Sequence, residues 1–509
     1  MTRDQLARLL QQPPQPARAY LVGAGGCGVS ALGHLLLDRG WEVCGSDLAA
    51  NDDVERLRAR GARIVLGHDA ARVREEHPAL VAFSSAVASD NPELNAAREL
   101  GLPVVRRAAL LAALMQDKTG ICVAGMHGKT TTAALLAYAL EQLGAAPAFA
   151  IGGFVPQLEG NARWASAPAH PSHRHPCAGT LQGSPDQAAA ALWAHLLFVA
   201  EADESDGTLP EFQPACSVVL NIDAEHLDYF ADVQAVRDEF RRFIQQTQGL
   251  VCYCADDPHL PELVQGKPGA VSYGFHPEAD YRIELPPDEA AAVGDASSPP
   301  TACSNGSLKR FRVWHRGQPF GEFELRLLGG QNVSNAGAVV ALLHQLGFSA
   351  KAIHAAIAGF LGVARRQEEL FRDERFRVFT DYGHHPVEIQ ATLQAFREVT
   401  PGRLLVGFQP HRYTRTQHLL EQFRGAFGQA DCLWVADIYA ASEPPIPGVH
   451  AAQLASAITT RGPRAEYVAT LEQLCEAIRR TVRPGDVVLF LGAGDIDQAA
   501  RAFARSLQA

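Results

Sequence analysis

The chain has 509 residues, which is too long for one hydrophobic core and predicts about three domains. Hydrophobic residues make up 47% and charged residues 20%, as in ordinary globular proteins, and the net charge of -11 argues against nucleic acid or an anionic membrane surface as partner. Ten cysteines without a Cys-x-x-Cys pair, and the lack of a long apolar run, predict a cytoplasmic protein with reduced thiols and no membrane insertion.

The first predicted α/β unit contains a glycine-rich turn. A short strand over Arg18–Val22 leads into Gly23–Gly28 and an apolar helix, and a second strand follows over Glu42–Gly45. Asp47 comes 19 residues after Gly28, as in dinucleotide-binding βαβ units where an acid meets a ribose. The same turn can hold any diphosphate, so the pattern predicts a diphosphate at a helix N-terminus without selecting NAD.

The segment Gly120–Thr132 is the most informative part of the chain. It reads as an apolar strand, a glycine turn, then Lys129 and Thr130 at the start of a helix. Backbone N–H groups of such a turn bind phosphate oxygens, the lysine neutralises them, and the first hydroxyl of the helix can hold Mg²⁺. Val123 stands where a full Walker A motif has its first glycine. The segment still predicts a nucleoside triphosphate site.

Acidic residues follow the next predicted strands of this unit, Leu197–Ala200 and Ser217–Asn221. Glu201–Asp206 holds four acids, and His226 lies in the polar run after the second strand. Parallel strands end at the same edge of a sheet, where ligands bind. We therefore expect one carboxylate to face the lysine-threonine turn and assist Mg²⁺ binding. Spacing alone does not identify which one.

Two segments interrupt the α/β pattern and are predicted to be surface loops, Ser166–Gln187 and Pro286–Leu308. His173, His175 and Cys177 lie in the first of them. Because no second ligand pair has matching spacing, a solvated loop is favoured over a metal site.

A third α/β unit begins near Gly362. It ends in a strand followed by a glycine turn, Gly492–Asp495. Its predicted strands are Arg377–Thr380, Arg403–Phe408, Cys432–Ile438 and Val487–Leu491. Alternating strands and helices predict a mostly parallel sheet.

Taken in order, these motifs resemble the Mur ligases of bacterial cell-wall synthesis. The resemblance rests on Gly23–Gly28, Gly125–Thr132, Gly152-Gly153, Asn161–Arg163, Glu201–Gly207, Asn221–Asp228, Asn332–Asn335, Arg365-Arg366, Asp381–Pro386, Gln409–Thr416 and Gly492–Ile496. It implies an α/β fold of three domains. These are a Rossmann-like domain for the UDP sugar over 1–116, a P-loop ATPase-type domain with a mostly parallel sheet over 117–361, and a Rossmann-like domain for ATP and the amino acid over 362–509.

The resemblance also implies an activity. ATP would phosphorylate the lactyl carboxylate of UDP-N-acetylmuramate, and L-alanine would attack the resulting acyl phosphate, in the synthesis of peptidoglycan precursors. ATP and Mg²⁺ are the implied cofactors. The partners would be these small molecules, and the protein would be a monomer or homodimer.

Site residues are carried over from the family position by position. The UDP sugar would contact Gly23, Gly25, Gly26, Gly28, Asp47, Ser84 and Arg163. ATP would contact Gly125, His127, Gly128, Lys129, Thr130, Thr131, Asn332, Asn335, Arg366 and Asp381. The amino acid would contact Tyr382, His384, His411, Arg412 and Arg415. Metal ions would bind Thr130, Glu201 and His226, and the catalytic residues would be Lys129, His226, His384 and His411.

Several positions depart from the family pattern. They are Met126, Glu225, Gln331, Gln367 and Thr380. Gln331 and Thr380 lie where the adenine and ribose contacts are expected. The phosphate and metal residues named above are all present.

Three alternatives to the alanine-adding ligase stay open at this stage. One is the related recycling ligase that joins a ready-made peptide to the same sugar nucleotide, and the sequences Asp381–His385 and Gln409–Arg415 favour the alanine adder over it. Another is an NAD-dependent oxidoreductase built on Gly23–Gly28, which leaves Lys129 unexplained. The third is a nucleotide sensor that binds ATP without turnover.

Overall fold

The structure, a computed structural model, describes residues 1–165, 184–204, 207–223, 230, 232–286, 308–441 and 443–508. The chain divides into two compact units. The first comprises Met1–Asp288, Arg310–Glu324 and Ser334–Phe360. The second comprises Glu289–Lys309, Leu325–Val333 and Leu361–Ala509.

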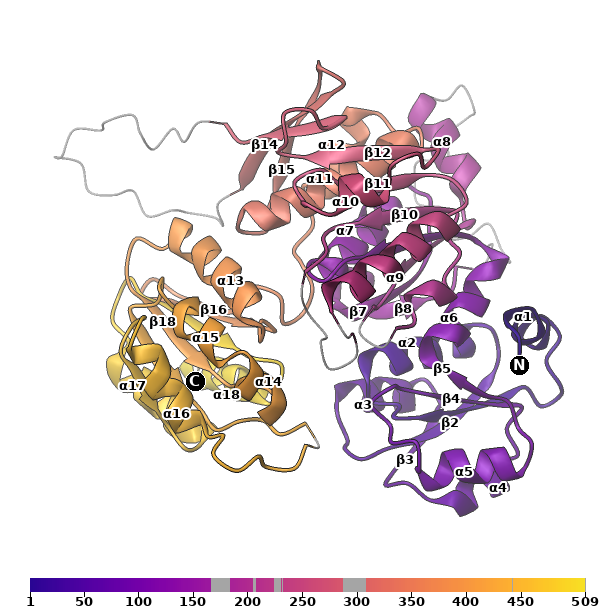
Figure 1. Ribbon diagram of the computed structural model, residues 1–509, viewed down its shortest axis with the longest axis horizontal. Coiled ribbons are helices and arrows are strands. Elements are labelled where there is room, and N and C mark those ends of the chain that lie inside the picture. Colours follow the sequence, from indigo (N-terminus) through magenta and orange to yellow (C-terminus); the bar gives the residue numbers. More distant parts are fainter. Residues whose placement is uncertain are drawn as a thin grey trace. The chain divides into compact units, whose positions relative to one another are not determined.

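The first unit begins with a five-stranded parallel sheet in the order β3-β2-β1-β4-β5 (Figure 1). Its strands are β1 (Arg18–Val22), β2 (Glu42–Asp47), β3 (Arg63–Leu66), β4 (Leu80–Phe83) and β5 (Val104–Arg106). The helices around it are α1 (Arg3–Gln11), α2 (Cys27–Asp38), α3 (Asp52–Ala59), α4 (Ala70–Glu76), α5 (Pro92–Glu99) and α6 (Arg107–Leu114). The strand order reverses between β1 and β4, so their carboxyl ends form the edge where such sheets bind ligands.

A second sheet has ten strands in the order β15-β14-β13-β12-β11-β10-β6-β9-β7-β8. The strands are β6 (Thr119–Ala124), β7 (Ala148–Val155), β8 (Gly160–Arg163), β9 (Leu197–Glu201), β10 (Cys216–Val219), β11 (Val251–Cys254), β12 (Ala270–Gly274), β13 (Tyr281–Glu284), β14 (Lys309–His315) and β15 (Gln318–Leu325). The pairs from β7 through β13 are parallel, while β8 and β14 pair in antiparallel fashion with β7 and β13. β6 lies centrally, which buries it on both faces.

The described residues of this part of the chain form the helices α7 (Lys129–Gln142), α8 (Pro185–Trp193), α9 (Val233–Gln246), α10 (Leu260–Leu263), α11 (Gly330–Gln345) and α12 (Ala350–Ile357). Helix α7 is buried along most of its length, from Thr130 to Leu140. A helix that is apolar on nearly all sides belongs in a protein interior, and this burial fixes its N-terminus against the end of β6.

The second unit contains a six-stranded sheet in the order β16-β17-β21-β18-β19-β20. Its strands are β16 (Glu368–Arg372), β17 (Arg377–Asp381), β18 (Leu404–Phe408), β19 (Cys432–Val435), β20 (Ala465–Tyr467) and β21 (Val487–Leu491). All neighbours are parallel except the antiparallel pair β16 and β17. Its helices are α13 (Pro386–Val399), α14 (Tyr413–His418), α15 (Leu420–Ala426), α16 (Ala451–Thr459), α17 (Leu471–Thr481) and α18 (Ile496–Gln508).

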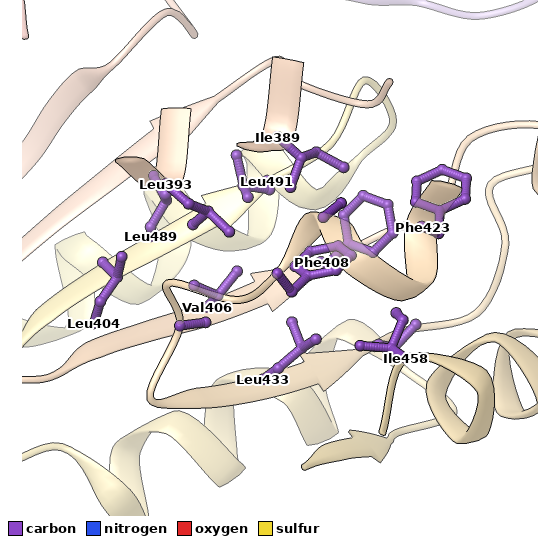
Figure 2. Packing of buried hydrophobic residues seen from close by; sticks show 14 of the residues in the cluster. Ile389, Leu393, Leu404, Val406, Phe408, Phe423, Leu433, Ile458, Leu489 and Leu491 are labelled. Carbon is purple, nitrogen blue, oxygen red and sulfur yellow. The ribbon is translucent and has the colours of Figure 1, made fainter. Parts of the chain in front are cut away.

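Both faces of this sheet are covered by apolar side chains. Figure 2 shows Ile389 and Leu393 of α13 packing onto Val406 and Leu489 of the sheet, with Phe423 of α15 nearby. A second cluster on the opposite face joins strand residues to α17 and α18. Burial on both faces explains why the strands are nearly continuous apolar runs.

The predicted strands are confirmed, although several of their ends differ. β2 continues to Asp47, β9 to Glu201 and β17 to Asp381, and β18 begins at Leu404. β10 ends at Val219 instead of Asn221, and β19 ends at Val435 instead of Ile438. The eight described cysteines are free thiols. Among the described residues, no helix is both long and apolar enough to cross a bilayer. The predicted surface loops fall mainly on 166–183 and 287–307, which lie outside the described part of the chain, as do His173, His175 and Cys177 in the first of them. The end of the first predicted loop was wrong, because residues 185–187 form the start of α8.

Candidate active site

The turn between β6 and α7 requires glycine at two positions. Gly125 has a φ of 141° and Gly128 a φ of 85°, a region that residues with a Cβ atom rarely adopt. A Cβ atom on Gly128 would lie 2.7 Å from Oδ1 of Asn335, and one on Gly125 would lie 2.9 Å from Cβ of Leu220. The turn is therefore closely packed, and its backbone N–H groups lie at the N-terminus of α7, where phosphate binds readily.

Lys129 is the first residue of α7, and its ammonium group lies inside the turn. Nζ donates to the carbonyl oxygens of Gly125 at 2.6 Å and Met126 at 3.3 Å, and to Oε1 of Glu204 at 2.6 Å. Burial disfavours the charge of Lys129, but the carboxylates around it, Glu204 first, outweigh this effect and raise the pKa of Lys129. Burial raises the pKa of Glu204 to about 7, against the lowering effect of Lys129.

Thr130 and Glu201 form the adjacent corner of the site. The Thr130 hydroxyl lies 3.0 Å from both carboxylate oxygens of Glu201, and the N–H of Gly152 donates to Oε2 of Glu201 at 2.7 Å. A hydroxyl and a carboxylate at the end of a strand fit Mg²⁺, which prefers oxygen ligands and takes several of them from phosphate and water. Within the described residues, no three His, Cys, Asp or Glu side chains are grouped so that they could hold a metal by themselves.

Asn221 holds the other side of the turn. Its Oδ1 accepts from the N–H of His127 at 2.8 Å, and its Nδ2 donates to the carbonyl of His127 at 3.0 Å. Nε2 of His127 lies 3.4 Å from Oδ2 of Asp223. Thr131 follows Thr130 in the first turn of α7. The predicted metal ligand His226 and its neighbour Glu225 lie outside the described residues.

The first glycine turn lies at the carboxyl end of β1. Gly23 has a φ of 78°, and a Cβ atom there would lie 3.7 Å from Cβ of Ser84, which follows β4. Asp47 accepts from the N–H groups of Gly25 at 2.7 Å and Ala49 at 3.0 Å. Asp47 therefore holds the turn itself in place. Gly26 is the N-cap of α2.

Arg107 is a residue of this region that the motifs do not indicate. A Cβ atom on Gly28 would lie 2.6 Å from Cδ of Arg107, and the Arg107 guanidinium pairs with Asp203 at 2.8 Å. Arg107 thus connects the first glycine turn with the acidic run after β9. No local sequence signal reveals it, because the contact joins residues 96 positions apart.

Strand β8 contributes a contact to the same turn. Asn161, which is only 1% exposed, donates to the carbonyl of Cys27 and to the hydroxyl of Ser30, both at 3.1 Å. Arg163, predicted to contact the sugar nucleotide, pairs with Glu141 of α7 at 2.5 Å, and its role toward the nucleotide stays a prediction. Asn161 is therefore the β8 side chain that reaches the turn.

The second unit brings its predicted residues together at the carboxyl ends of β17, β18 and β21. The ring of Tyr382 is flanked by two guanidinium groups, Arg365 at 4.9 Å and Arg366 at 5.1 Å from its centroid. Arg365 also donates to the carbonyls of Gly492 at 3.1 Å and Gly494 at 2.9 Å. These carbonyl contacts join Arg365 to the turn after β21.

Two histidines lie beside the arginines. Nδ1 of His384 is 3.1 Å from the carbonyl oxygen of Tyr382 and donates to it, which leaves Nε2 as the acceptor of the neutral ring. Nδ1 of His411 accepts from Arg415 at 3.1 Å. Burial lowers the pKa of His384 to about 4; burial, with the charges of His384, Arg415 and Arg412, lowers the pKa of His411 to about 3.

Arg412 stands between β18 and α14 in a backbone conformation with a φ of 70°. Within the described part of the chain, its Nε is buried and has no hydrogen-bond partner. A buried guanidinium N–H without a protein acceptor fits a carboxylate ligand.

Asp381 and Asn332 are held by backbone and amide groups of the second unit. Asp381 accepts from the N–H of Gln367 at 2.8 Å and the N–H of Gly383 at 2.7 Å, and burial raises its pKa. The side-chain amide of Gln367 bonds to Leu328 and lies 3.3 Å from that of Asn332.

Thr380 and Met126, two of the positions that depart from the family pattern, lie in closely packed surroundings. The hydroxyl of Thr380 donates to Oδ1 of Asp497 at 3.1 Å, and Met126 is 5% exposed within the first-unit turn. Gln331 lies in the first turn of α11.

Family models match most of the chain. The Mur ligase family catalytic domain matches residues 18–119, the Mur ligase middle domain 123–343, and the Mur ligase glutamate ligase domain 365–494. The UDP-N-acetylmuramate–L-alanine ligase of Sorangium cellulosum (strain So ce56) is 39% identical over 497 residues, which cover 96% of each chain. The protein of the same name from Anaeromyxobacter sp. (strain Fw109-5) is 39% identical over 491 residues, covering 95% of this chain and 96% of that one.

A solved structure agrees with these relatives. The crystal structure of the UDP-N-acetylmuramate-alanine ligase MurC from Thermotoga maritima has a TM-score of 0.76 and 27% identity, and the match covers 96% of this chain and 99% of that one. The chain therefore belongs to the Mur ligase family and has its three-domain α/β fold. The predicted family is confirmed. The predicted domain boundaries and the individual site residues stay predictions.

Proposed function

We propose that this chain is an ATP-dependent ligase that joins L-alanine to the lactyl carboxylate of UDP-N-acetylmuramate, with release of ADP and phosphate. The observation that carries the proposal is the corner formed by Lys129, Thr130 and Glu201, in a chain whose relatives of 39% identity are named as ligases for these two substrates. An acid and an amine do not condense in water unassisted, so the carboxylate has to be activated.

In the first step a lactyl carboxylate oxygen attacks the γ-phosphorus of ATP. The bond between that phosphorus and the bridging oxygen of ADP breaks, giving an acyl phosphate. Two anions have to approach each other, so positive charge in the site lowers the barrier. We assign this charge to Lys129, aided by the backbone N–H groups of the glycine turn.

Thr130 and Glu201 are the described residues that would hold Mg²⁺, and His226 stays a predicted ligand of a second ion. When bound, the metal supplies further positive charge beside the phosphates. The close approach of the Thr130 hydroxyl to both oxygens of Glu201, at 3.0 Å each, supports this assignment.

In the second step the amine of L-alanine attacks the activated carbonyl carbon, and the carbon–oxygen bond to phosphate breaks. The nitrogen loses one proton. We assign the α-carboxylate of alanine to Arg412 and Arg415, since a guanidinium fork pairs with a carboxylate in two-point fashion. Tyr382 and the two histidines would border the same ligand.

His384 is suited to receive the amine proton. Its Nδ1 donates to the Tyr382 carbonyl, so Nε2 carries the lone pair. The pKa of about 4 makes the ring a weak base in the absence of substrate. An alanine carboxylate beside Arg415 offsets a positive charge that lowers this pKa, so the substrate itself would make His384 more basic.

A phosphate-release assay tests the proposal. With ATP, Mg²⁺, UDP-N-acetylmuramate and L-alanine present, we expect steady release that stops when any one component is omitted. A tripeptide in place of L-alanine should give little release. Preference for the tripeptide would establish the recycling ligase, and ATP binding without release under any condition would establish a nucleotide sensor.

We also propose that the enzyme works in the cytoplasm as a monomer or homodimer. The requirement for ATP and the free state of the eight described cysteines support the compartment. Sedimentation of the purified protein at several concentrations tests the oligomeric state.

A further inference from the structure

We propose that Glu204 is a positioning residue that competes with the nucleotide for Lys129 and thereby weakens the binding of the ADP product. The inference rests on the proposed function, because it takes Lys129 as the phosphate-binding cation. It assigns a role to one acid of the run after β9, where the sequence did not distinguish the carboxylates.

The contacts of Lys129 carry the argument. An ammonium group has three N–H donors, and here they meet three acceptors, the carbonyls of Gly125 and Met126 and the carboxylate of Glu204. The Glu204 contact, at 2.6 Å, is the one made to an acidic side chain; the other two acceptors are neutral carbonyls. A phosphate oxygen that binds Lys129 must replace or share at least this partner.

Among the three described acids of the run, Glu204 is the one that contacts Lys129. Glu201 is bonded to Thr130 and Gly152, and Asp203 pairs with Arg107. The side chain of Glu204 is 0% exposed, so its carboxylate cannot turn outward into water when the lysine changes partner. Its charge therefore stays close to Lys129 and to any phosphate bound there.

This arrangement has two consequences for a ligase. Before the nucleotide binds, Glu204 keeps the lysine in the turn and balances a charge that is costly to bury alone. After phosphoryl transfer, the same carboxylate repels the phosphates of ADP and favours their departure. Product release limits the rate of many enzymes, so a residue that weakens ADP binding aids turnover.

The test is the dissociation constant of ADP, measured by calorimetry on the full-length protein. Glu204→Gln keeps the size and the hydrogen-bond acceptor but removes the charge, and we expect ADP to bind about 10-fold more tightly or better. Asp203→Asn is the matched control. It removes the charge of the residue next to Glu204, a carboxylate that pairs with Arg107. We expect ADP affinity to stay within about threefold of wild type.

A double-variant comparison shows whether the effect passes through the lysine. In a Lys129→Ala background, Glu204→Gln should no longer tighten ADP binding, because the ammonium group for which Glu204 and phosphate compete is absent. A residue with a merely structural role would weaken ADP binding when changed, whereas the proposal requires the opposite sign. Unchanged or weaker binding by folded Glu204→Gln would overturn it.

Folding of the variant is checked by circular dichroism. If Glu204→Gln does not fold, Glu204→Asp takes its place, since the shorter side chain keeps the charge but draws it back from Nζ. It should tighten ADP binding by about threefold, and no tightening would again overturn the proposal. Failure of the proposed function is distinct, because it would appear as a wild-type protein that binds no ADP or releases no phosphate.

Discussion

Lys129 is the residue on which phosphoryl transfer should depend most. Its side chain is 12% exposed and already lies in the turn that would receive phosphate. Positive charge at this point gains importance as the γ-phosphoryl group moves from one oxygen to another, so Lys129→Ala should lower kcat by at least about a thousandfold. Lys351→Ala, at an exposed position of α12, is the control for the loss of a lysine and should keep wild-type kcat. Steady-state phosphate release measures both, and retained activity in Lys129→Ala would refute the assignment.

Arg412 offers a separable test of the amino-acid site. Its buried Nε has no hydrogen-bond partner within the described residues, which suits a bound carboxylate. Arg412→Ala should raise the KM for L-alanine about 100-fold while the KM for ATP changes little, because the lost contact belongs to one substrate. Arg412→Lys should recover only part of the affinity, since an ammonium group lacks the planar fork. A variant with unchanged alanine dependence and weakened ATP binding would exclude this role.

At the scale of elements, helix α7 depends on a glycine at each end. Gly128 and Gly144 have nearly equal φ values, 85° and 82°. A Cβ atom on Gly128 would meet Oδ1 of Asn335 at 2.7 Å, whereas one on Gly144 would find its nearest neighbour only at 4.0 Å. Comparing the two alanine variants therefore separates backbone strain from steric clash.

We expect Gly144→Ala to lower the free energy of unfolding by about 1 kcal/mol from strain alone. Gly128→Ala should cost about 2 kcal/mol or more, and it should also weaken ADP binding because the turn moves. Denaturant unfolding and ADP calorimetry measure the two effects. Equal losses in both variants, with normal ADP binding, would show that the contact with Asn335 has no role.

The sequence predicted the strands of the parallel sheets well, because strands buried on both faces are continuous apolar runs between turn signals. The predicted strand ends were less accurate where a strand leads into the candidate site. β10 stops at Val219 because Asn221 bonds to His127 and Met126 in the neighbouring turn. Those bonds join residues about a hundred positions apart, which no local pattern reports.

The site residues divide in the same way. Lys129 and Thr130 are marked by a turn whose spacing is itself the signal. Arg107 and Glu204 become evident only in the fold, because each acts through a partner distant in sequence. Which acid after β9 faces Thr130 and which faces Lys129 likewise depends on side-chain directions, and these cannot be predicted from composition.

At the scale of the whole molecule, buried histidines connect stability to pH. Burial lowers the pKa of His34 to about 4, of His384 to about 4 and of His411 to about 3, against an ordinary value of 6.5. Between pH 6.5 and about 4 the unfolded chain therefore binds more protons than the folded protein. Stability rises with pH across this window, is fully present above pH 6.5, and is lost on acidification.

Glu204 changes stability with pH in the direction opposite to the histidines. Its pKa is raised from 4.5 to about 7, so between these values the folded state binds more protons and this group favours folding as the pH falls. The three histidines outweigh Glu204, so these four groups together lose stability on acidification. Each histidine should contribute a loss of about 1 kcal/mol at pH 5.5 relative to pH 7.5.

Hydrogen exchange resolved by segment is the measurement that suits a chain of several domains, since a single unfolding midpoint would mix them. His34→Asn should reduce the acid sensitivity of protection in α2 and the strands beside it. The double variant His384→Asn with His411→Asn should do so in β17 and β18 and leave α2 as in the wild type. Protection that is equal at pH 5.5 and 7.5 in the wild-type protein would contradict the neutral state of these histidines, because a ring already charged in the folded protein has no proton left to gain.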